Sequence, residues 1–230
     1  MKLYVQEQGD GDRTAVLIHG GMADHGTWHA VTSHLVRQGY RVLAPDLRGH
    51  GRSARGAYRP AALAEDLTES LPTGADIAIG HSLGGLALAL AVGQLAPRRI
   101  VYSDPGFGLN GMDNSVPKGL RAMVDQASRE SIQRANPRWS KADVKAELAG
   151  FALFDRAFLT HIESFDGDYL PAPPAVPSLV QLADPSLTID AATAELLRSR
   201  GFEITVVAGA GHCIHRDDFQ GFIESLRGWI

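Results

Sequence analysis

The segment from residue 75 to residue 86 constrains the fold of this chain more than any other, because it reads as a strand, a sharp turn and a helix. In the sequence ADIAIGHSLGGL, Ile77 and Ile79 predict a buried strand, and the Leu- and Ala-rich stretch after Leu83 predicts a buried helix. The turn follows the pattern G-x-S-x-G, with glycines where a Cβ would collide with neighbouring backbone. Such a turn presents Ser82 above the end of a strand, beside the free N–H groups of a helix N-terminus.

Apolar runs typical of buried strands alternate with helical patterns along the chain. This alternation predicts an α/β fold with a mostly parallel, doubly wound sheet. The predicted strands are Leu3 to Glu7, Thr14 to Ile18, Arg41 to Ala44, Asp76 to Ile79, Arg99 to Tyr102, Ser178 to Leu182 and Glu203 to Val207, and the predicted helices are Trp28 to Gln38, Pro60 to Leu71, Leu83 to Leu95, Ala191 to Arg200 and Asp218 to Trp229. Ligands bind at the carboxyl ends of strands in such sheets, so we expect a site at that edge.

Residues 105–177 interrupt the alternation. They show no convincing strand, but they contain helical patterns at Lys118 to Arg134 and Lys141 to Phe165, followed by the proline-rich residues 171–177. We interpret 105–177 as a small helical cap inserted into a core formed by residues 1–104 and 178–230. Its aromatic residues have two interpretations: they form a small core of the cap, or some of them line an apolar pocket.

Composition sets further limits on what the chain does. With 230 residues, 44% of them hydrophobic, it is long enough for one domain with a full core. The net charge of −4 comes from 22 basic and 26 acidic residues that are mixed along the chain, which argues against a nucleic-acid partner. There is no signal-peptide pattern and no apolar run of about 18 residues, so we expect a cytoplasmic protein without a membrane partner, as a monomer or homodimer. The single cysteine, Cys213, fits a reducing compartment.

Four motifs, in the expected order, resemble those of the α/β-hydrolase superfamily. They are HGG at residues 19–21, DLRGHGRS at 46–53, GHSLG at 80–84 and GH at 211–212. The resemblance covers essentially the whole chain and implies an α/β-hydrolase fold. It also implies acyl transfer by a Ser-His-acid triad, with Ser82 as the nucleophile and with no metal or organic cofactor. The substrate does not follow from the resemblance, because this fold hosts many reactions.

The base of the triad is predicted to be His212, and two residues compete for the acid. His212 follows the last predicted strand in a glycine-rich loop, whereas His215 lies inside the next segment. Asp184 follows the strand after the cap, the usual place for the acid in this superfamily, although counting in the family's frame lands on Ser186. Asp104 follows the strand before the cap, where some members carry the acid, but its Asp-Pro sequence is also typical of a turn. We favour Asp184 and keep Asp104 as the alternative.

The expected oxyanion hole consists of the backbone N–H groups of Leu83 and Gly21, with Met22 as the next choice after Gly21. The residues expected to contact the substrate are His81, Trp28, Phe107, Met112, Trp139, Phe154 and Phe158. The predicted function is hydrolysis of a carboxylic ester or lactone of a medium-sized apolar molecule through an acyl-enzyme. The alternatives are a C–C bond hydrolase or lyase on the same scaffold, and a non-catalytic small-molecule binder.

Overall fold

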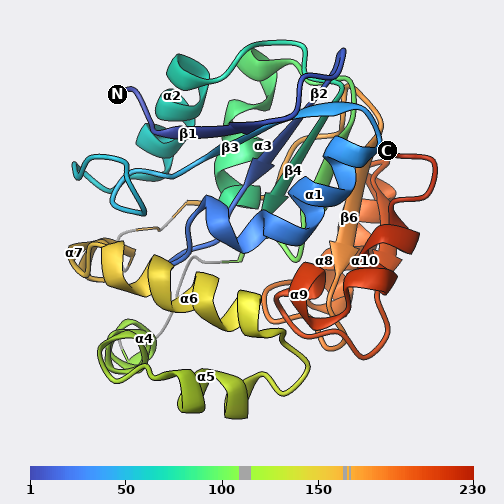
Figure 1. Cartoon of the computed structure of the whole chain (residues 1–230). Coiled ribbons are helices and arrows are strands. Elements are labelled where there is room, and N and C mark those ends of the chain that lie inside the picture. The colour runs from blue at the N-terminus through green and yellow to red at the C-terminus, as the bar shows by residue number, and fades with distance from the viewer. Residues whose placement is uncertain (109–114, 163–164, 166) are drawn as a thin grey trace.

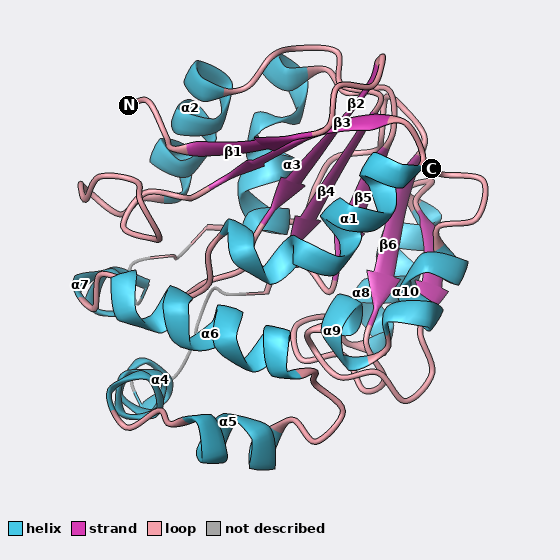
Figure 2. Cartoon of the chain, in the orientation of Figure 1, coloured by secondary structure: helices cyan, strands magenta, loops and turns pink. Residues whose placement is uncertain are grey.

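A seven-stranded sheet forms the centre of the computed structural model, which describes residues 1–108, 115–162, 165 and 167–230. Its strands are β1 (Val5–Gln8), β2 (Arg13–Ile18), β3 (Tyr40–Pro45), β4 (Ile77–His81), β5 (Ile100–Ser103), β6 (Ser178–Leu182) and β7 (Glu203–Val206). They lie in the order β1-β3-β2-β4-β5-β6-β7. Only β1 runs antiparallel to its neighbour in this sheet, which confirms the predicted, mostly parallel arrangement (Figure 2).

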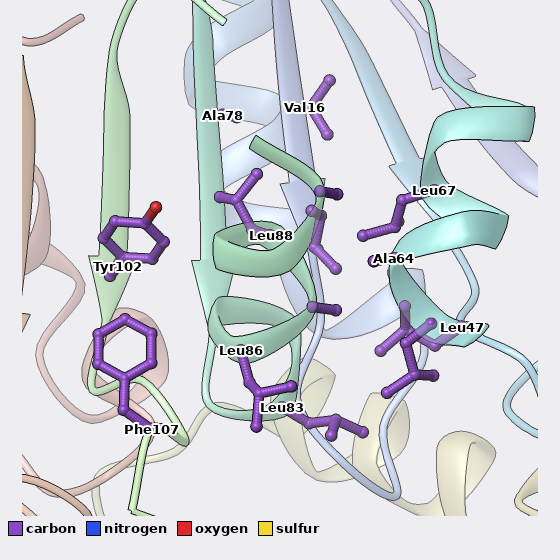
Figure 3. Packing of buried hydrophobic residues seen from close by; sticks show 14 of the residues in the cluster. Val16, Leu47, Ala64, Leu67, Ala78, Leu83, Leu86, Leu88, Tyr102 and Phe107 are labelled. Carbon is purple, nitrogen blue, oxygen red and sulfur yellow. The ribbon is translucent and has the colours of Figure 1, made fainter. Parts of the chain in front are cut away.

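Helices cover both faces of the sheet, as the alternation of strands and helices predicts. Helices α2 (Pro60–Ser70), α3 (Leu83–Leu95) and α8 (Ala191–Ser199) contribute to one hydrophobic cluster, and α1 (His29–Arg37) and α10 (Phe219–Ser225) contribute to the other. Figure 3 shows Leu86 and Leu88 of α3 in the first cluster, together with Val16 of β2 and Leu67 of α2. Because both faces are covered, all five residues of β4 are buried. Ser82 follows this buried strand directly, at its carboxyl end.

Between β5 and β6, the described residues form four helices: α4 (Ser115–Asp125), α5 (Arg129–Ala135), α6 (Lys141–Leu153) and α7 (Ala157–His161). They lie beyond the arrowheads of β4 and β6, which mark the carboxyl ends of these strands (Figures 1 and 2). We keep the name cap for residues 105–177.

The cap contains shorter helices than the periodicity predicts. The expected helix 118–134 is divided at Ser128, whose side chain caps the N-terminus of α5. The expected helix 141–165 ends at Leu153, because the N–H of Asp155 bonds to the carbonyl of Gly49 in the core and draws the chain out of the helix. Outside the cap, the expected last helix, Asp218 to Trp229, is also shorter: α10 begins after its N-cap Asp218 and ends at Ser225, and a separate short helix, α9 (Ile214–Asp217), precedes it.

Two further observations concern the helices and the side-chain clusters of the described residues. None of their helices is both long enough and apolar enough to cross a membrane. In the same part of the chain, no cluster of His, Cys, Asp and Glu is arranged to hold a metal ion.

Candidate active site

Ser82 lies in the turn between β4 and α3 with a backbone geometry that few residues other than glycine adopt. Its φ is 49° and its ψ is −117°, a strained conformation for an L-residue. The turn requires both flanking glycines: a Cβ on Gly80 would lie 2.6 Å from the carbonyl oxygen of Gly84, and a Cβ on Gly84 would lie 2.5 Å from that of His19. The half-buried serine is therefore held at the carboxyl end of the sheet, at the N-terminus of α3.

The loop that follows β2 lies against this turn. A Cβ on Gly20 would come within 2.7 Å of Nδ1 of His81 and 3.3 Å of Cβ of Ser82. A Cβ on Gly21 would lie 3.9 Å from the side chain of Leu83. The structure therefore brings together two of the residues expected to supply oxyanion-hole N–H groups, Gly21 and Leu83, next to the serine.

His19 holds this loop in place through both of its ring nitrogens. Nε2 accepts a hydrogen bond from the N–H of Leu47 at 2.9 Å, so the proton must be on Nδ1, which donates to the carbonyl of Gly20 at 2.7 Å. The third oxyanion candidate, Met22, has a φ of 65°. Its carbonyl oxygen lies 3.0 Å from where a Cβ on Gly150 of α6 would be, so the cap packs on the same loop.

The imidazole of His212, in the loop after β7, donates a hydrogen bond from Nδ1 to Oδ2 of Asp104 across 2.6 Å. Its backbone carbonyl accepts a hydrogen bond from Nε2 of His81 at 2.9 Å. Because Nδ1 is bonded to the carboxylate, Nε2 is the nitrogen left to accept a proton. Neither this nitrogen nor the hydroxyl of Ser82 hydrogen-bonds to another described residue. His81 connects the two residues: it precedes Ser82 in the chain, its ring bonds to the backbone of His212, and the two imidazole centroids are 4.8 Å apart.

His81 is a neutral spacer in this arrangement. The residue is 5% exposed, and burial, followed by electrostatic repulsion from His212 and Arg216, holds the pKa of His81 well below its usual value. We expected His81 to contact the substrate. In the structure, its ring instead contacts the backbone of the His212 loop.

Asp104 is fully buried and has four hydrogen-bond donors around it. Oδ1 accepts from the N–H of Ala183 at 3.2 Å and from the hydroxyl of Ser186 at 2.6 Å. Oδ2 accepts from His212 and from the N–H of Leu187 at 3.4 Å. Burial favours the neutral acid, but these hydrogen bonds, with that from the imidazole first, outweigh it and lower the pKa of Asp104. The residue is therefore an anion at neutral pH.

The preference for Asp184 as the partner of the imidazole is wrong. Its exposed side chain accepts a hydrogen bond from the N–H of Gly209 at 3.1 Å, at the turn that leads toward His212. β5 and β6 are paired, so the two carboxylates follow neighbouring strand ends, and only the path of the loops decides which one reaches the imidazole. The carboxylate that reaches the imidazole is that of Asp104, although its Asp-Pro sequence is also typical of a turn.

Trp28 and His215 lie in the core on one face of the sheet. The two rings stack with their centroids 4.1 Å apart, and both residues pack on Phe222 of α10. Trp28 is not exposed at all, so the expectation that it contacts the substrate is wrong. His215 is 2% exposed, which excludes it as the base.

The aromatic residues around the cap pack mainly on one another and on the core. Phe154 and Phe158 surround His50, with ring centroids 4.8 and 5.2 Å from it, and Phe107 contacts Tyr102 at 5.3 Å. All three phenylalanines are 1% exposed, so the structure supports the interpretation of a shared core and not that of an open pocket lining. The expected substrate contact Met112 lies outside the described residues.

Trp139 joins the cap to the His212 loop instead of facing a substrate. Its indole N–H donates to Oδ1 of Asp217 at 2.7 Å, and the guanidinium of Arg216 lies 3.8 Å from its ring centroid. Sequence reasoning missed this connection, because nothing in the local pattern relates residue 139 to residues 216 and 217.

A hollow of about 330 Å³ lies at the opposite end of the sheet from Ser82. It is lined by the C-terminal part of α3, by residues 171–176 of the proline-rich segment and by the first residues of β5 and β6. Its position at the amino ends of these strands separates it from the triad.

Comparison with known proteins agrees with the fold. Residues 15–224 match the model of a family described as "Alpha/beta hydrolase family". The chain is 34% identical over 149 residues to "Lipase LipV" of Mycobacterium tuberculosis, a match that covers 61% of this chain and 54% of the lipase. It is 31% identical over 144 residues to the pimeloyl-[acyl-carrier protein] methyl ester esterase of Yersinia enterocolitica, covering 60% of this chain and 55% of the esterase. The matched parts thus span about half the length of these relatives.

Among solved structures, "Est816 as an N-Acyl homoserine lactone degrading enzyme" superposes with a TM-score of 0.75 at 22% identity, over 99% of this chain and 96% of that one. At this identity the likeness concerns the fold.

Proposed function

Because the chain belongs to the alpha/beta hydrolase family, we propose that it is a serine hydrolase that cleaves a carboxylic ester or lactone of a medium-sized apolar substrate. The observation that carries the proposal is the 2.6 Å hydrogen bond between His212 and the buried Asp104, at the sheet edge where the strained turn presents Ser82. A nucleophile, an imidazole with one free nitrogen and a buried carboxylate are the parts that acyl transfer by a triad needs.

The first half-reaction would form an acyl-enzyme. Oγ of Ser82 attacks the substrate carbonyl carbon while Nε2 of His212 takes the hydroxyl proton, and Asp104 stabilises the imidazolium that results. The imidazolium then returns the proton to the leaving alkoxide as the carbonyl–oxygen bond breaks. In a lactone, the released alcohol remains attached to the acyl group.

The second half-reaction would release the acid by the same groups. His212 takes a proton from water, the hydroxide attacks the acyl carbon, and the proton returns to Oγ of Ser82. In both halves the N–H groups of Leu83 and Gly21 would stabilise the tetrahedral oxyanion. One such donor typically contributes about 10²–10³ in rate.

The substrate class rests on three supports of unequal strength. Two relatives are named as a lipase and as a methyl ester esterase, which favours an ester. Met22, in the loop after β2, and Leu148 of α6 are apolar residues that are only partly buried, which favours an apolar acyl group. The lactone possibility rests on the fold shared with an enzyme that degrades acyl homoserine lactones.

The proposal is tested with a panel of p-nitrophenyl esters of increasing acyl length, assayed with the wild type and with Ser82→Ala. We expect the variant to lose at least about 10³-fold in kcat, because the covalent step is removed. We also expect a fluorophosphonate probe to label the wild type and not the variant. Equal turnover of the panel by both proteins would overturn the proposal.

A further inference from the structure

The hydroxyl of Ser186 has a defined orientation beside the acid of the site. Its oxygen accepts hydrogen bonds from the N–H of Thr188 at 3.3 Å and from the N–H of Ile189 at 3.0 Å. A serine hydroxyl has two acceptor lone pairs and a single donor hydrogen. Since both lone pairs are occupied, its hydrogen is left for Oδ1 of Asp104, 2.6 Å away.

This contact decides how the carboxylate of Asp104 is turned. Oδ1 is held by Ser186 and by the N–H of Ala183, whereas Oδ2 faces Nδ1 of His212 at 2.6 Å. Without the hydroxyl of Ser186, Oδ1 keeps a single donor, the N–H of Ala183 at 3.2 Å, and the carboxylate is held less firmly in the orientation that presents Oδ2 to the imidazole. Because Asp104 is fully buried, no water takes the place of a lost donor without entering the core.

We propose that Ser186 is a positioning residue for the triad. Its hydroxyl fixes the orientation of the Asp104 carboxylate and stabilises the negative charge of that group. The inference rests on the proposed function and extends it to a fourth side chain. The loop after β6 thus contributes the support of the acid, while the strand end after β5 contributes the acid itself.

The experiment compares Ser186→Ala with Ser186→Thr, which keeps a hydroxyl, and with Ser103→Ala as the matched control. Ser103 precedes Asp104, is fully buried and donates to Oε1 of Gln181 at 2.7 Å, so its loss removes a buried serine hydrogen bond of similar length that does not involve the carboxylate. Ser186→Cys, with a weaker donor, replaces Ser186→Ala if the alanine variant does not fold.

The first readout is independent of turnover. The Nδ1 proton of His212, bonded to a carboxylate, gives a downfield imidazole N–H signal in the proton NMR spectrum, identified by its loss in Asp104→Asn. We expect Ser186→Ala to broaden this signal or shift it upfield, and Ser186→Thr and Ser103→Ala to retain it. A signal unchanged in Ser186→Ala, or lost equally in Ser103→Ala, would overturn the inference.

The second readout is the pH dependence of ester hydrolysis. We expect kcat of Ser186→Ala to fall about tenfold with KM within twofold, because a hydrogen bond to a charged group is lost and the substrate contacts are kept. The low-pH limb of kcat/KM should move to higher pH, because a carboxylate with one donor fewer stabilises the protonated imidazole of His212 more strongly, and the protonated ring cannot act as the base. An unchanged kcat and limb would overturn the inference. The proposed function is tested separately: if Ser82→Ala stays active, the proposed function fails, whatever the Ser186 variants show.

Discussion

Three residues of the candidate site, Met22, Ser82 and Asp104, have backbone geometry that is unusual for residues other than glycine. Ser82 has a φ of 49° and Asp104 a φ of 39°, and they follow the neighbouring strands β4 and β5. Such conformations cost on the order of 1–3 kcal/mol each, and they persist where surrounding contacts compensate for them. At Asp104 the compensation is the set of four donors around its carboxylate.

The choice between the two aspartates gives a prediction at the scale of single residues. We expect Asp104→Asn to lower kcat by about 10³–10⁴, because an amide neither fixes the imidazole tautomer nor stabilises its cation. Asp184→Asn should change kcat by less than about threefold, because the amide oxygen still accepts from the N–H of Gly209. Steady-state kinetics on the same ester measures both. A larger loss in Asp184→Asn than in Asp104→Asn would contradict the assignment.

At the scale of elements, α6 and the residues just before it connect the cap to both loops of the site. Near its start, Arg138 donates to the carbonyl of Gly209 at 2.6 Å, and Glu147 of α6 pairs with the buried Arg216 at 2.7 Å. Near its end, Gly150 packs closely on the loop that carries Met22. The helix is therefore attached to the His212 loop and to the loop of the oxyanion-hole candidates.

This attachment predicts that one charge at the cap junction matters to the stability of the whole chain. We expect Glu147→Ala to lower the free energy of unfolding by about 3 kcal/mol, because the guanidinium of Arg216, 4% exposed, loses its ionic partner. Glu195→Ala is the control, since its pair with Arg198 is mostly exposed and should contribute nothing measurable. Urea unfolding measures the difference. Equal stability of the two variants would show that the cap is not fixed through this pair.

At the scale of the whole molecule, several histidines are buried as neutral rings. Burial lowers the pKa values of His19, His50, His81 and His215, that of His50 to about 3. In the unfolded chain these groups bind protons below about pH 6.5, whereas in the folded chain they do not. For these four groups the unfolded state therefore binds more protons in this range, and their contribution lowers the stability as the pH drops below about 6.5.

His215→Phe isolates one part of this acid sensitivity. The ring nitrogens of His215 are buried and have no hydrogen-bond partner among the described residues, and a phenyl ring suits its stacked position on Trp28. Between pH 7.5 and pH 5, we expect the variant to lose about 2 kcal/mol less unfolding free energy than the wild type. Urea unfolding at the two pH values tests this. An identical pH dependence in both proteins would contradict the assignment of His215 as a neutral core residue.

The sequence by itself determined the features that depend on neighbouring residues. The spacing of apolar residues located all seven strands within a few residues, and the buried parallel strands β4, β5 and β6 most directly, because such a strand must be apolar on both faces. The two glycines around Ser82 located the sharp turn, because only a residue without a Cβ fits where backbone approaches within 3 Å. Helix boundaries in the cap were less accurate, since Ser128 and the contact of Asp155 with Gly49 interrupt a continuous helical pattern.

Only the tertiary structure decided which of two well-placed carboxylates meets the imidazole. Asp104 and Asp184 follow paired strands at the same edge of the sheet, so strand position does not separate them. Their difference lies in burial and in donors from a loop about 80 residues away along the chain, at Ala183 and Ser186. The aromatic residues are a similar case: Trp28 follows an active-site loop in sequence, but the packing of α10 buries it away from the site. Contacts between distant segments carry no local pattern, and the folded chain alone specifies them.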